Sequence, residues 1–363
     1  MERIVVGVVG AGTMGAGIAQ LAVENGHEVV LHDVDEAAIE RGRARVREGL
    51  VRRALRLDLD GDSADEWVDG RLAALRDANS LDAVGAEAEL VIEAALEDLE
   101  LKRAIFRALD EAAGPDVVLA TNTSALSVAA IAEATRRPQR VMGLHFFNPA
   151  PVIPLVEVVI APATDPGLAE RALALMTAWG KTPVRCTDTP GFIVNRVNRP
   201  FTLEALRMLE AGVASVDAVD AAVRAGGFPM GPFELMDFIG IDVNLAAAQA
   251  VWERLGRPVR LRPSPIQADL VAEGRLGRKT GTGFYAYDDD RRVAVAESGP
   301  NRAHFQLTGA EILDRILSAV DAEARQALAE GVATADDIDL ALRAGARHPT
   351  GPFERALGTS RHT

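Results

Sequence analysis

The chain of 363 residues has a single cysteine, Cys186, so an intrachain disulfide is excluded. No metal-ligand spacing surrounds this residue, and we expect a packed thiol and no bound metal. The chain also lacks an apolar run long enough to cross a membrane. It begins directly with a strand-like run rather than a signal peptide. These absences predict a soluble, cytoplasmic protein with no membrane partner.

Basic residues are in the minority. The formal net charge of −14 at pH 7 argues against nucleic acid as a partner. One helix-like segment departs from this balance, because arginines crowd it and only Glu48 opposes them there. Its arginines are Arg41, Arg43, Arg45, Arg47, Arg52, Arg53 and Arg56. Two interpretations stay open, a solvated helix face and a surface for an anionic ligand, since guanidinium groups bind phosphate through paired hydrogen bonds.

A glycine-rich turn stands near the start of the chain, between a β-branched run at residues 3–9 and a helix-forming run at residues 16–24. Its sequence is Gly10-Ala11-Gly12-Thr13-Met14-Gly15, which has the spacing of a dinucleotide-binding turn. The first glycine permits the tight turn, the second lets the backbone approach a pyrophosphate, and the third lets helix pack on strand. The phosphates would rest on the helix N-terminus.

An acidic residue follows where such a fold binds the ribose. Residues 28–32 predict a second strand, and Asp33 comes directly after it. A carboxylate at this place bonds the ribose 2′-hydroxyl and repels the additional phosphate of NADP. The sequence therefore predicts NAD as cofactor and an α/β Rossmann-type doubly wound sheet to hold it.

A histidine and a glutamate further along predict an acid–base pair. Residues 140–146 and 155–160 indicate two strands joined by a proline-rich turn. If the hairpin is centred on that turn, His145 and Glu157 lie opposite each other on one face of the sheet. A carboxylate beside an imidazole fixes its tautomer and stabilises the imidazolium. The pair suits removal of a hydroxyl proton while hydride leaves the same carbon; a buried structural histidine is the alternative.

These motifs, with several others, resemble the 3-hydroxyacyl-CoA dehydrogenase family, whose members oxidise (S)-3-hydroxyacyl-CoA to 3-ketoacyl-CoA with NAD. The resemblance runs from Arg3 to about Tyr287. Besides the glycine turn and the histidine motif at residues 143–149, the matching segments are residues 92–102, 121–124, 188–196, 229–234 and 277–285.

The resemblance implies a role for each matching side chain. His145 is the general base, Glu157 is its partner, and Ser124 and Asn195 hold the substrate oxygen. Hydroxyl and amide groups suit that task because they bond both the alcohol and the ketone. The residues along the cofactor would be Gly10, Gly12, Thr13, Met14, Gly15, Asp33, Glu97, Lys102, Ser124, Asn148 and Lys279. The arginine-rich segment becomes a candidate site for the nucleotide end of coenzyme A, with Arg52 and Arg53 as contacts.

Two other functions stay open. Sugar-acid dehydrogenases of the L-gulonate type share the superfamily, but they carry proline at the position of Phe146, so the sequence favours the acyl-CoA branch. A non-catalytic NAD-binding protein needs no base, and the joint presence of Ser124, His145, Glu157 and Asn195 argues against it. We expect a role in fatty-acid β-oxidation or a related butyrate-type pathway.

The C-terminal part repeats the helical region. Residues 312–345 align with residues 193–226 without a gap, and 14 of the 34 positions are identical. Unrelated segments match at about one position in fifteen, so this is an internal duplication. Residues 351–354 then repeat residues 231–234, and Asp314 stands at the position of Asn195.

We therefore expect an all-α domain after the sheet, followed by a partial second copy of it. The predicted segments are an NAD-binding domain at 1–187, a helical domain at 188–287, a polar linker at 288–300 and the partial repeat at 301–363. In short family members two helical domains pair across a dimer. The resemblance thus implies that the repeat takes the partner's place, while a homodimer of the whole chain stays possible.

Overall fold

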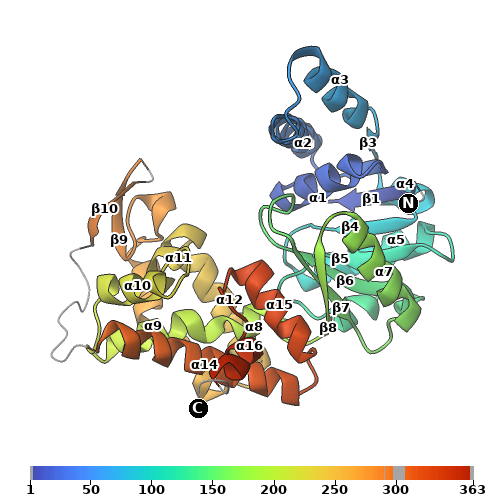
Figure 1. Ribbon diagram of the computed structural model, residues 1–363. Helices are drawn as coiled ribbons and strands as arrows, with labels where there is room; N and C mark the ends of the chain where they lie inside the picture. The colour runs from blue at the N-terminus through green and yellow to red at the C-terminus, as the bar shows by residue number, and fades with distance from the viewer. Residues whose placement is uncertain (1–2, 290, 297–306, 360–363) are drawn as a thin grey trace. The chain divides into compact units, whose positions relative to one another are not determined.

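The computed structural model describes residues 3–289, 291–296 and 307–359. The chain divides into two compact units, residues 1–189 and 190–363 (Figure 1). The first unit is α/β and the described part of the second is almost entirely helical, in the order that the sequence predicts. The predicted boundaries at 187 and 287 stay predictions.

The first unit is built on an eight-stranded sheet in the order β3-β2-β1-β4-β5-β6-β7-β8. Neighbouring strands are parallel, except that β6 and β7 pair antiparallel. The order of the first six strands is that of a doubly wound dinucleotide-binding sheet, which confirms the predicted fold class. The strands are β1 (Val5–Val9), β2 (Glu28–His32), β3 (Leu75–Asp77), β4 (Leu90–Glu93), β5 (Val118–Thr121), β6 (Val141–Phe146), β7 (Leu155–Ile160) and β8 (Thr182–Thr187).

Helices cover the sheet, so its central strands are buried along almost their whole length and consist mainly of aliphatic residues. The helices are α1 (Thr13–Glu24), α2 (Glu36–Arg56), α3 (Gly61–Leu72), α4 (Leu81–Glu87), α5 (Leu99–Ala112), α6 (Val128–Ala132) and α7 (Pro166–Ala178). Figure 1 shows α2 and α3 standing out from the sheet at the β3 edge. Two glycines allow α2 to lie against its neighbours. A Cβ on Gly42 would come within 2.9 Å of the Ala11 carbonyl oxygen, and one on Gly49 within 1.9 Å of Gln20.

The second unit begins with a helix that the sequence predicts as continuous over residues 195–210. It is instead broken at Asn198 into α8 (Val194–Val197) and α9 (Arg199–Glu210). Pro200 explains the break, because proline has no N–H to donate to the preceding turn. The helices that follow are α10 (Val216–Ala225), α11 (Pro232–Ile239), α12 (Ile241–Arg254), α13 (Pro265–Ala272), α14 (Gly309–Ala329), α15 (Ala335–Ala346) and α16 (Pro352–Thr359).

The two copies of the helical sequence form the same local structure. In the first copy the Asp220 carboxylate accepts hydrogen bonds from the N–H groups of Phe233 and Glu234, at 3.0 Å each. In the second copy Asp339 does the same for Phe353 and Glu354, at 2.8 and 2.9 Å. Burial raises the pKa of Asp220 to about 7. Helix α14 packs along α9 and α10, and α15 packs on α8 (Figure 1).

The stretch expected to be a linker is partly structured. Strands β9 (Tyr285–Asp288) and β10 (Arg291–Val295) form an antiparallel hairpin. Of the charged residues that suggested a linker, Asp288 therefore ends β9, and Arg291 and Arg292 begin β10. Residues 297–306 and 360–363, which are predicted to belong to the linker and the repeat, lie outside the described residues.

The described residues hold no cluster of histidine, cysteine, aspartate or glutamate side chains suited to a metal ion. Among them, no single helix is both long and apolar enough to span a membrane. The bent pair formed by α11 and α12, at 101°, passes that test by length and composition alone.

Candidate active site

The glycine turn joins β1 to α1, and its three glycines differ in the space around them. Gly10 has φ of +99°, and a Cβ there would lie 2.7 Å from the Ala94 carbonyl oxygen. A Cβ on Gly15 would lie 1.7 Å from the Gly10 oxygen, so only glycine fits. Above Gly12 nothing lies within 4 Å of a Cβ position. The open space beside the N-terminus of α1 fits a pyrophosphate, which needs close backbone approach.

Asp33 follows β2 and is bonded into this turn. One of its carboxylate oxygens accepts a hydrogen bond from the Ala11 N–H at 2.8 Å, and the other accepts one from Asp35 at 3.2 Å. Asp33 is half-buried, and its neighbour Val34 is exposed. The carboxylate thus lies where a dinucleotide's ribose meets the sheet in this fold.

This placement predicts a preference for NADH over NADPH of at least about tenfold in kcat/KM, because the Asp33 carboxylate repels a 2′-phosphate. The double variant Asp33→Ser with Val34→Arg should narrow the preference, since it replaces the repelling charge with an attracting one. Steady-state assays with NADH and with NADPH measure this preference as a ratio of kcat/KM values. Val34→Arg alone is the control and keeps the carboxylate. A native enzyme that uses both cofactors equally would contradict the assignment.

His145 and Glu157 are direct cross-strand partners in the β6–β7 pair, as the sequence predicts. Nδ1 of His145 lies 2.6 Å from Oε2 of Glu157. The histidine side chain is 6% exposed and the glutamate side chain 0%. The ring of Phe147 lies against the imidazole, with centroids 4.6 Å apart. The two side chains therefore form a short polar contact that is buried beside strands β6 and β7.

Ser124 lies beyond the end of β5 and is held in place by Glu97. One oxygen of Glu97 accepts hydrogen bonds from the Thr123 hydroxyl at 2.6 Å and from the N–H groups of Ser124 and Ala125 at 2.9 and 3.0 Å. Burial raises the pKa of Glu97, but these bonds and the Lys102 charge outweigh it and leave the pKa below its ordinary value. Glu97 is therefore an anion that fixes the loop carrying Ser124.

Lys102 is buried, and its charge is shared between two carboxylates. Its Nζ donates to Oε1 of Glu93 at 2.6 Å and lies 3.5 Å from Glu97. The other oxygen of Glu93 accepts from the Thr121 hydroxyl at 2.7 Å. Glu93 and Thr121 lie in segments that match the family, but the sequence predicts no role for either, because a glutamate inside an apolar strand shows its partner only after folding. A cofactor role for Lys102 stays a prediction.

Lys181 is a further residue that sequence reasoning missed. Its buried Nζ donates to the carbonyl oxygens of Ala150 and Ile153, at 2.5 and 2.9 Å, in the loop that follows Asn148. Burial lowers the pKa of Lys181 to about 8, although Glu24 opposes this shift. Lys181 therefore holds the connection between the two strands that carry His145 and Glu157.

Asn195 and Lys279 belong to the second unit. Asn195 is half-buried in α8. Its neighbour Arg196 is fully buried, with Nε 2.9 Å from Glu323 and Nη1 2.6 Å from Glu330, both in or next to α14. Lys279 is exposed and pairs with Asp242 at 2.6 Å. In the described structure the second copy therefore anchors the short helix that carries Asn195.

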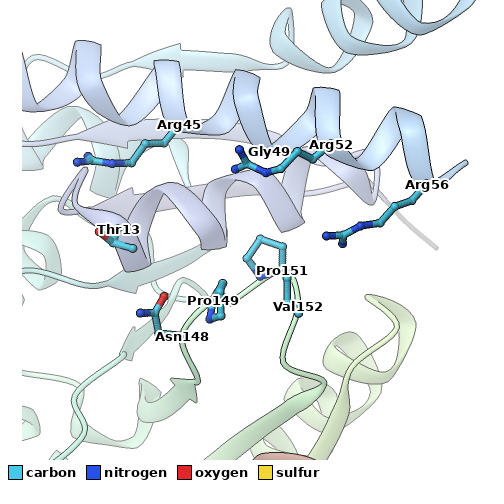
Figure 2. A pocket seen from close by; sticks show the side chains of 10 residues that line it. Thr13, Arg45, Gly49, Arg52, Arg56, Asn148, Pro149, Pro151 and Val152 are labelled. Carbon is cyan, nitrogen blue, oxygen red and sulfur yellow. The ribbon is translucent and has the colours of Figure 1, made fainter. Parts of the chain in front are cut away.

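A pocket of about 210 Å³ lies between α2 and the loop after β6. Figure 2 shows Arg45, Arg52 and Arg56 along one side of α2, facing this loop. Asn148 and Thr13 also line the pocket. Arg52 is thus on a concave basic surface, as the CoA interpretation requires.

The other arginines of α2 face carboxylates. Arg53, the second expected CoA contact, is not among the lining residues of this pocket, and its Nε lies 3.8 Å from Glu24. Arg41 pairs with Asp35, Arg43 with Asp77 and Arg47 with Asp69, and the pocket-lining Arg52 lies 3.8 Å from Glu48. Glu48 is therefore not the only acid that opposes these arginines, because the fold brings others from distant positions.

The doubly wound sheet, the glycine turn and Asp33 define an NAD-binding protein, and the buried histidine–carboxylate pair suits an oxidoreductase. Comparison with known families agrees. The family described as 3-hydroxyacyl-CoA dehydrogenase, NAD binding domain, matches residues 5–189. The corresponding C-terminal domain matches residues 191–287 and 312–359. The chain belongs to the 3-hydroxyacyl-CoA dehydrogenase family, whose members are NAD-dependent oxidoreductases.

Individual relatives cover most of the chain. A 3-hydroxyadipyl-CoA dehydrogenase of Escherichia coli (strain K12) is 45% identical over 332 residues, which are 89% of this chain and 69% of that protein. A 3-hydroxybutyryl-CoA dehydrogenase of Mycobacterium tuberculosis is 44% identical over 285 residues, 78% of this chain and 98% of the relative. The crystal structure of a 3-hydroxybutyryl-CoA dehydrogenase from Escherichia coli K12 superposes with a TM-score of 0.90 at 36% identity, covering 99% of this chain and 92% of that chain.

Proposed function

We propose that the protein interconverts (S)-3-hydroxyacyl-CoA and 3-ketoacyl-CoA, with His145 as the proton acceptor and Glu157 as its partner. The observation that carries the proposal is the 2.6 Å contact between these side chains, buried on adjacent strands of the NAD-binding unit. Oxidation of NADH in the presence of acetoacetyl-CoA and longer 3-ketoacyl-CoA esters tests it. A sugar acid with NAD serves as the control for the L-gulonate-type alternative.

The geometry suggests how the pair works. A carboxylate bonded to Nδ1 holds the proton on that nitrogen, so that Nε2 is the atom that takes the proton of the C3 hydroxyl. The glycine turn and Asp33 would hold NAD, which would supply the hydride acceptor for the same carbon. The imidazolium that results is stabilised by the buried charge of Glu157. In the reverse direction His145 returns the proton to the developing alkoxide.

We propose Ser124 and Asn195 as hydrogen-bond partners of the substrate oxygen. The hydroxyl of Ser124 can donate to a ketone and accept from an alcohol, so it serves both directions of the reaction. Glu97 acts through Ser124 as a positioning residue, because it binds the backbone on both sides of that hydroxyl. Asn122 contributes similarly, since its side-chain oxygen accepts from the Phe146 N–H at 2.8 Å, next to His145.

The arginine-lined pocket supports coenzyme A as the carrier. The phosphates of CoA are polyanionic, and Arg45, Arg52 and Arg56 line one concave surface of an otherwise acidic protein. Fatty-acid β-oxidation is the pathway that we propose for such a substrate. The names of these two relatives differ in the acyl part, adipyl in one and butyryl in the other.

Charge reversal tests the CoA assignment. The double variant Arg52→Glu with Arg56→Glu should raise KM for acetoacetyl-CoA by about tenfold or more and leave KM for NADH nearly unchanged, because only the ester loses phosphate contacts. The control is Arg47→Glu, on the same helix but paired with Asp69. Equal effects on both substrates, or none on either, would exclude the assignment.

We also propose that the second helical copy occupies the place of a dimer partner. In a symmetric pair, residue i of one copy contacts j of the other, and j contacts i. When the two copies are aligned by sequence, Arg196 corresponds to Arg315 and Glu204 corresponds to Glu323. Two ion pairs between the copies are related in this reciprocal way. Arg196 pairs with Glu323 at 2.9 Å, and the equivalent residues, Arg315 and Glu204, pair at 2.5 Å. Helix α14 packs along α9.

The second copy also contacts the first copy at the junction of α8 and α9. Nε2 of His348 lies 2.8 Å from Oδ1 of Asn198, at the break between α8 and α9. Burial lowers the pKa of His348 to about 3, so it contributes as a neutral ring. The proposed role of the repeat is therefore to stabilise α8, and with it Asn195, without adding a catalytic group of its own.

A further inference from the structure

Lys181 is a buried lysine whose amino group binds the loop that follows β6. It stands directly before β8, and its backbone N–H donates to the carbonyl oxygen of Met176 in α7 at 3.0 Å. The residue is only 7% exposed. Its Nζ donates to the carbonyl oxygens of Ala150 and Ile153, at 2.5 and 2.9 Å. Two of the three hydrogens of this amino group are therefore used to hold one loop.

The loop that Lys181 binds is one wall of the arginine-lined pocket. Residues 148–152 line the pocket, and Figure 2 shows the arginine side chains of α2 on the side facing this loop. The loop also packs on α1, where a Cβ on Gly17 would lie 3.1 Å from Cδ of Pro151 and 3.2 Å from Cβ of Ala150. Lys181 is not among the lining residues. It therefore acts on the pocket through the wall that it holds.

The strands on either side of this loop are fixed by the sheet. The pairing of β6 with β7 spans residues 143–146 and 156–159, so His145 and Glu157 lie inside the ladder. Strand β7 is also paired with β8 along its whole length. A change in the loop should therefore alter the pocket without moving the acid–base pair.

Lys181 also brings a positive charge close to this wall. Residues 148–154 of the loop and residues 176–180 at the end of α7 have no titratable side chain. Burial lowers the pKa of Lys181 to about 8, against the opposing charge of Glu24. The charged groups nearby are this carboxylate of α1, whose pKa burial raises, and the two arginines that act on it, Arg53 of α2 and Arg71 of α3. Because arginines stay charged, Lys181 is the cation of this cluster that loses its charge just above neutral pH.

We propose that Lys181 is a positioning residue for the coenzyme A ester, which holds the loop wall of the arginine-lined pocket in place and adds positive charge behind it. The inference rests on the proposed function, because it takes this pocket as the site of the CoA phosphates. A charged donor binds carbonyl oxygens more strongly than a neutral donor does. A buried charge is also screened less by salt than an exposed one, so it attracts a bound polyanion. Lys181 thus acts on the affinity for the ester rather than on the reacting atoms.

The test measures the oxidation of (S)-3-hydroxybutyryl-CoA by NAD in two variants of Lys181. Lys181→Met should raise KM for the ester about fivefold or more and change kcat and KM for NAD by less than about twofold, because only the pocket wall loses its bonds. Lys181→Arg should restore part of the ester affinity, since it keeps the charge and the donors. Arg185→Met is the control, because Arg185 is in β8 but exposed and paired with Glu170 at 2.9 Å; it should leave all three constants near wild type.

The pH dependence of KM for the ester tests the charge of Lys181. A polyanion in the pocket favours the protonated lysine, so the ester binds best below the pKa of Lys181 and more weakly as the pH rises through it. From about pH 7 to about pH 9, KM should therefore rise more in the wild type than in Lys181→Arg, whose guanidinium stays charged, or in Lys181→Met, which has no group to titrate. Identical pH profiles in the three proteins would overturn the inference.

Two further results would also overturn the inference. One is a Lys181→Met variant with an unchanged KM for the ester. The other is a variant that loses kcat, NAD affinity and ester affinity to the same extent, which indicates a lysine that supports the sheet as a whole.

Failure of this inference is distinguishable from failure of the CoA assignment. If Arg52→Glu with Arg56→Glu raises KM for the ester and Lys181→Met does not, only the role of Lys181 is wrong. If the double arginine variant leaves KM for the ester unchanged, the pocket is not the CoA site, and the assignment fails together with the inference built on it.

Discussion

His145→Gln is expected to lower kcat by about two to four orders of magnitude while NADH still binds. Glutamine has no group that accepts a proton at neutral pH, whereas its amide can still occupy the space beside Glu157. The loss should therefore fall on chemistry rather than on cofactor affinity. Steady-state kinetics with acetoacetyl-CoA measure the first quantity, and fluorescence titration with NADH measures the second.

Glu157→Gln is the variant with which the effect of His145→Gln on kcat is compared. It keeps the shape of the partner but removes the negative charge that stabilises the imidazolium, so its effect on kcat should be smaller than that of His145→Gln. Near-normal turnover in the His145→Gln variant would falsify the assignment. If both variants lose NADH binding in parallel with kcat, the pair supports the sheet and not the reaction.

Removal of residues 291–363 is the second change with a large expected effect. It would expose the apolar surfaces of α9 and α10 that α14 covers, where Ile312, Ile316 and Val320 are buried. We expect the shortened chain to form a homodimer or to become insoluble, because a pairing surface would be left without its partner. Size-exclusion chromatography with light scattering and a solubility assay distinguish these outcomes from a monomer.

The matched control for this deletion is Asp314→Ala in the full chain. Asp314 occupies the position of Asn195 in the second copy, and the proposal gives it no part in the reaction, so turnover should stay near wild type. A shortened chain that remains a stable monomer would contradict the pseudo-dimer. The covalent connection matters energetically, since it replaces association between chains by an intramolecular contact at roughly millimolar effective concentration.

Much of the first unit could be predicted because it follows local rules. Glu28–His32 and Leu155–Ile160 are strands over the predicted residues. The spacing of His145 and Glu157 around a proline-rich turn gives the observed register, because side chains alternate strictly along a strand. The glycine turn could also be predicted from the sequence, since the chain leaves no room for a Cβ at Gly10 or Gly15.

The features that the sequence did not reveal depend on contacts between distant positions. Lys102 is predicted to lie along the cofactor, and nothing near it in the sequence indicates that folding buries it against Glu93 at the end of β4. The arginines of α2 look unopposed until α3, β3 and the end of α1 bring their carboxylates.

The two reciprocal ion pairs differ in their surroundings. The side chains of Arg196 and Glu323 are 0% and 1% exposed, whereas Arg315 is 43% exposed in its pair with Glu204. In a homodimer one mutation alters both halves of an interface at once, so the halves must remain identical. If two copies share one chain, each substitution acts on one side only. The catalytic side can then keep Asn195 and a dry ion pair, while the other side accumulates Asp314 and a solvated one. Duplication within a single gene would in this way let a symmetric interface evolve into two specialised halves.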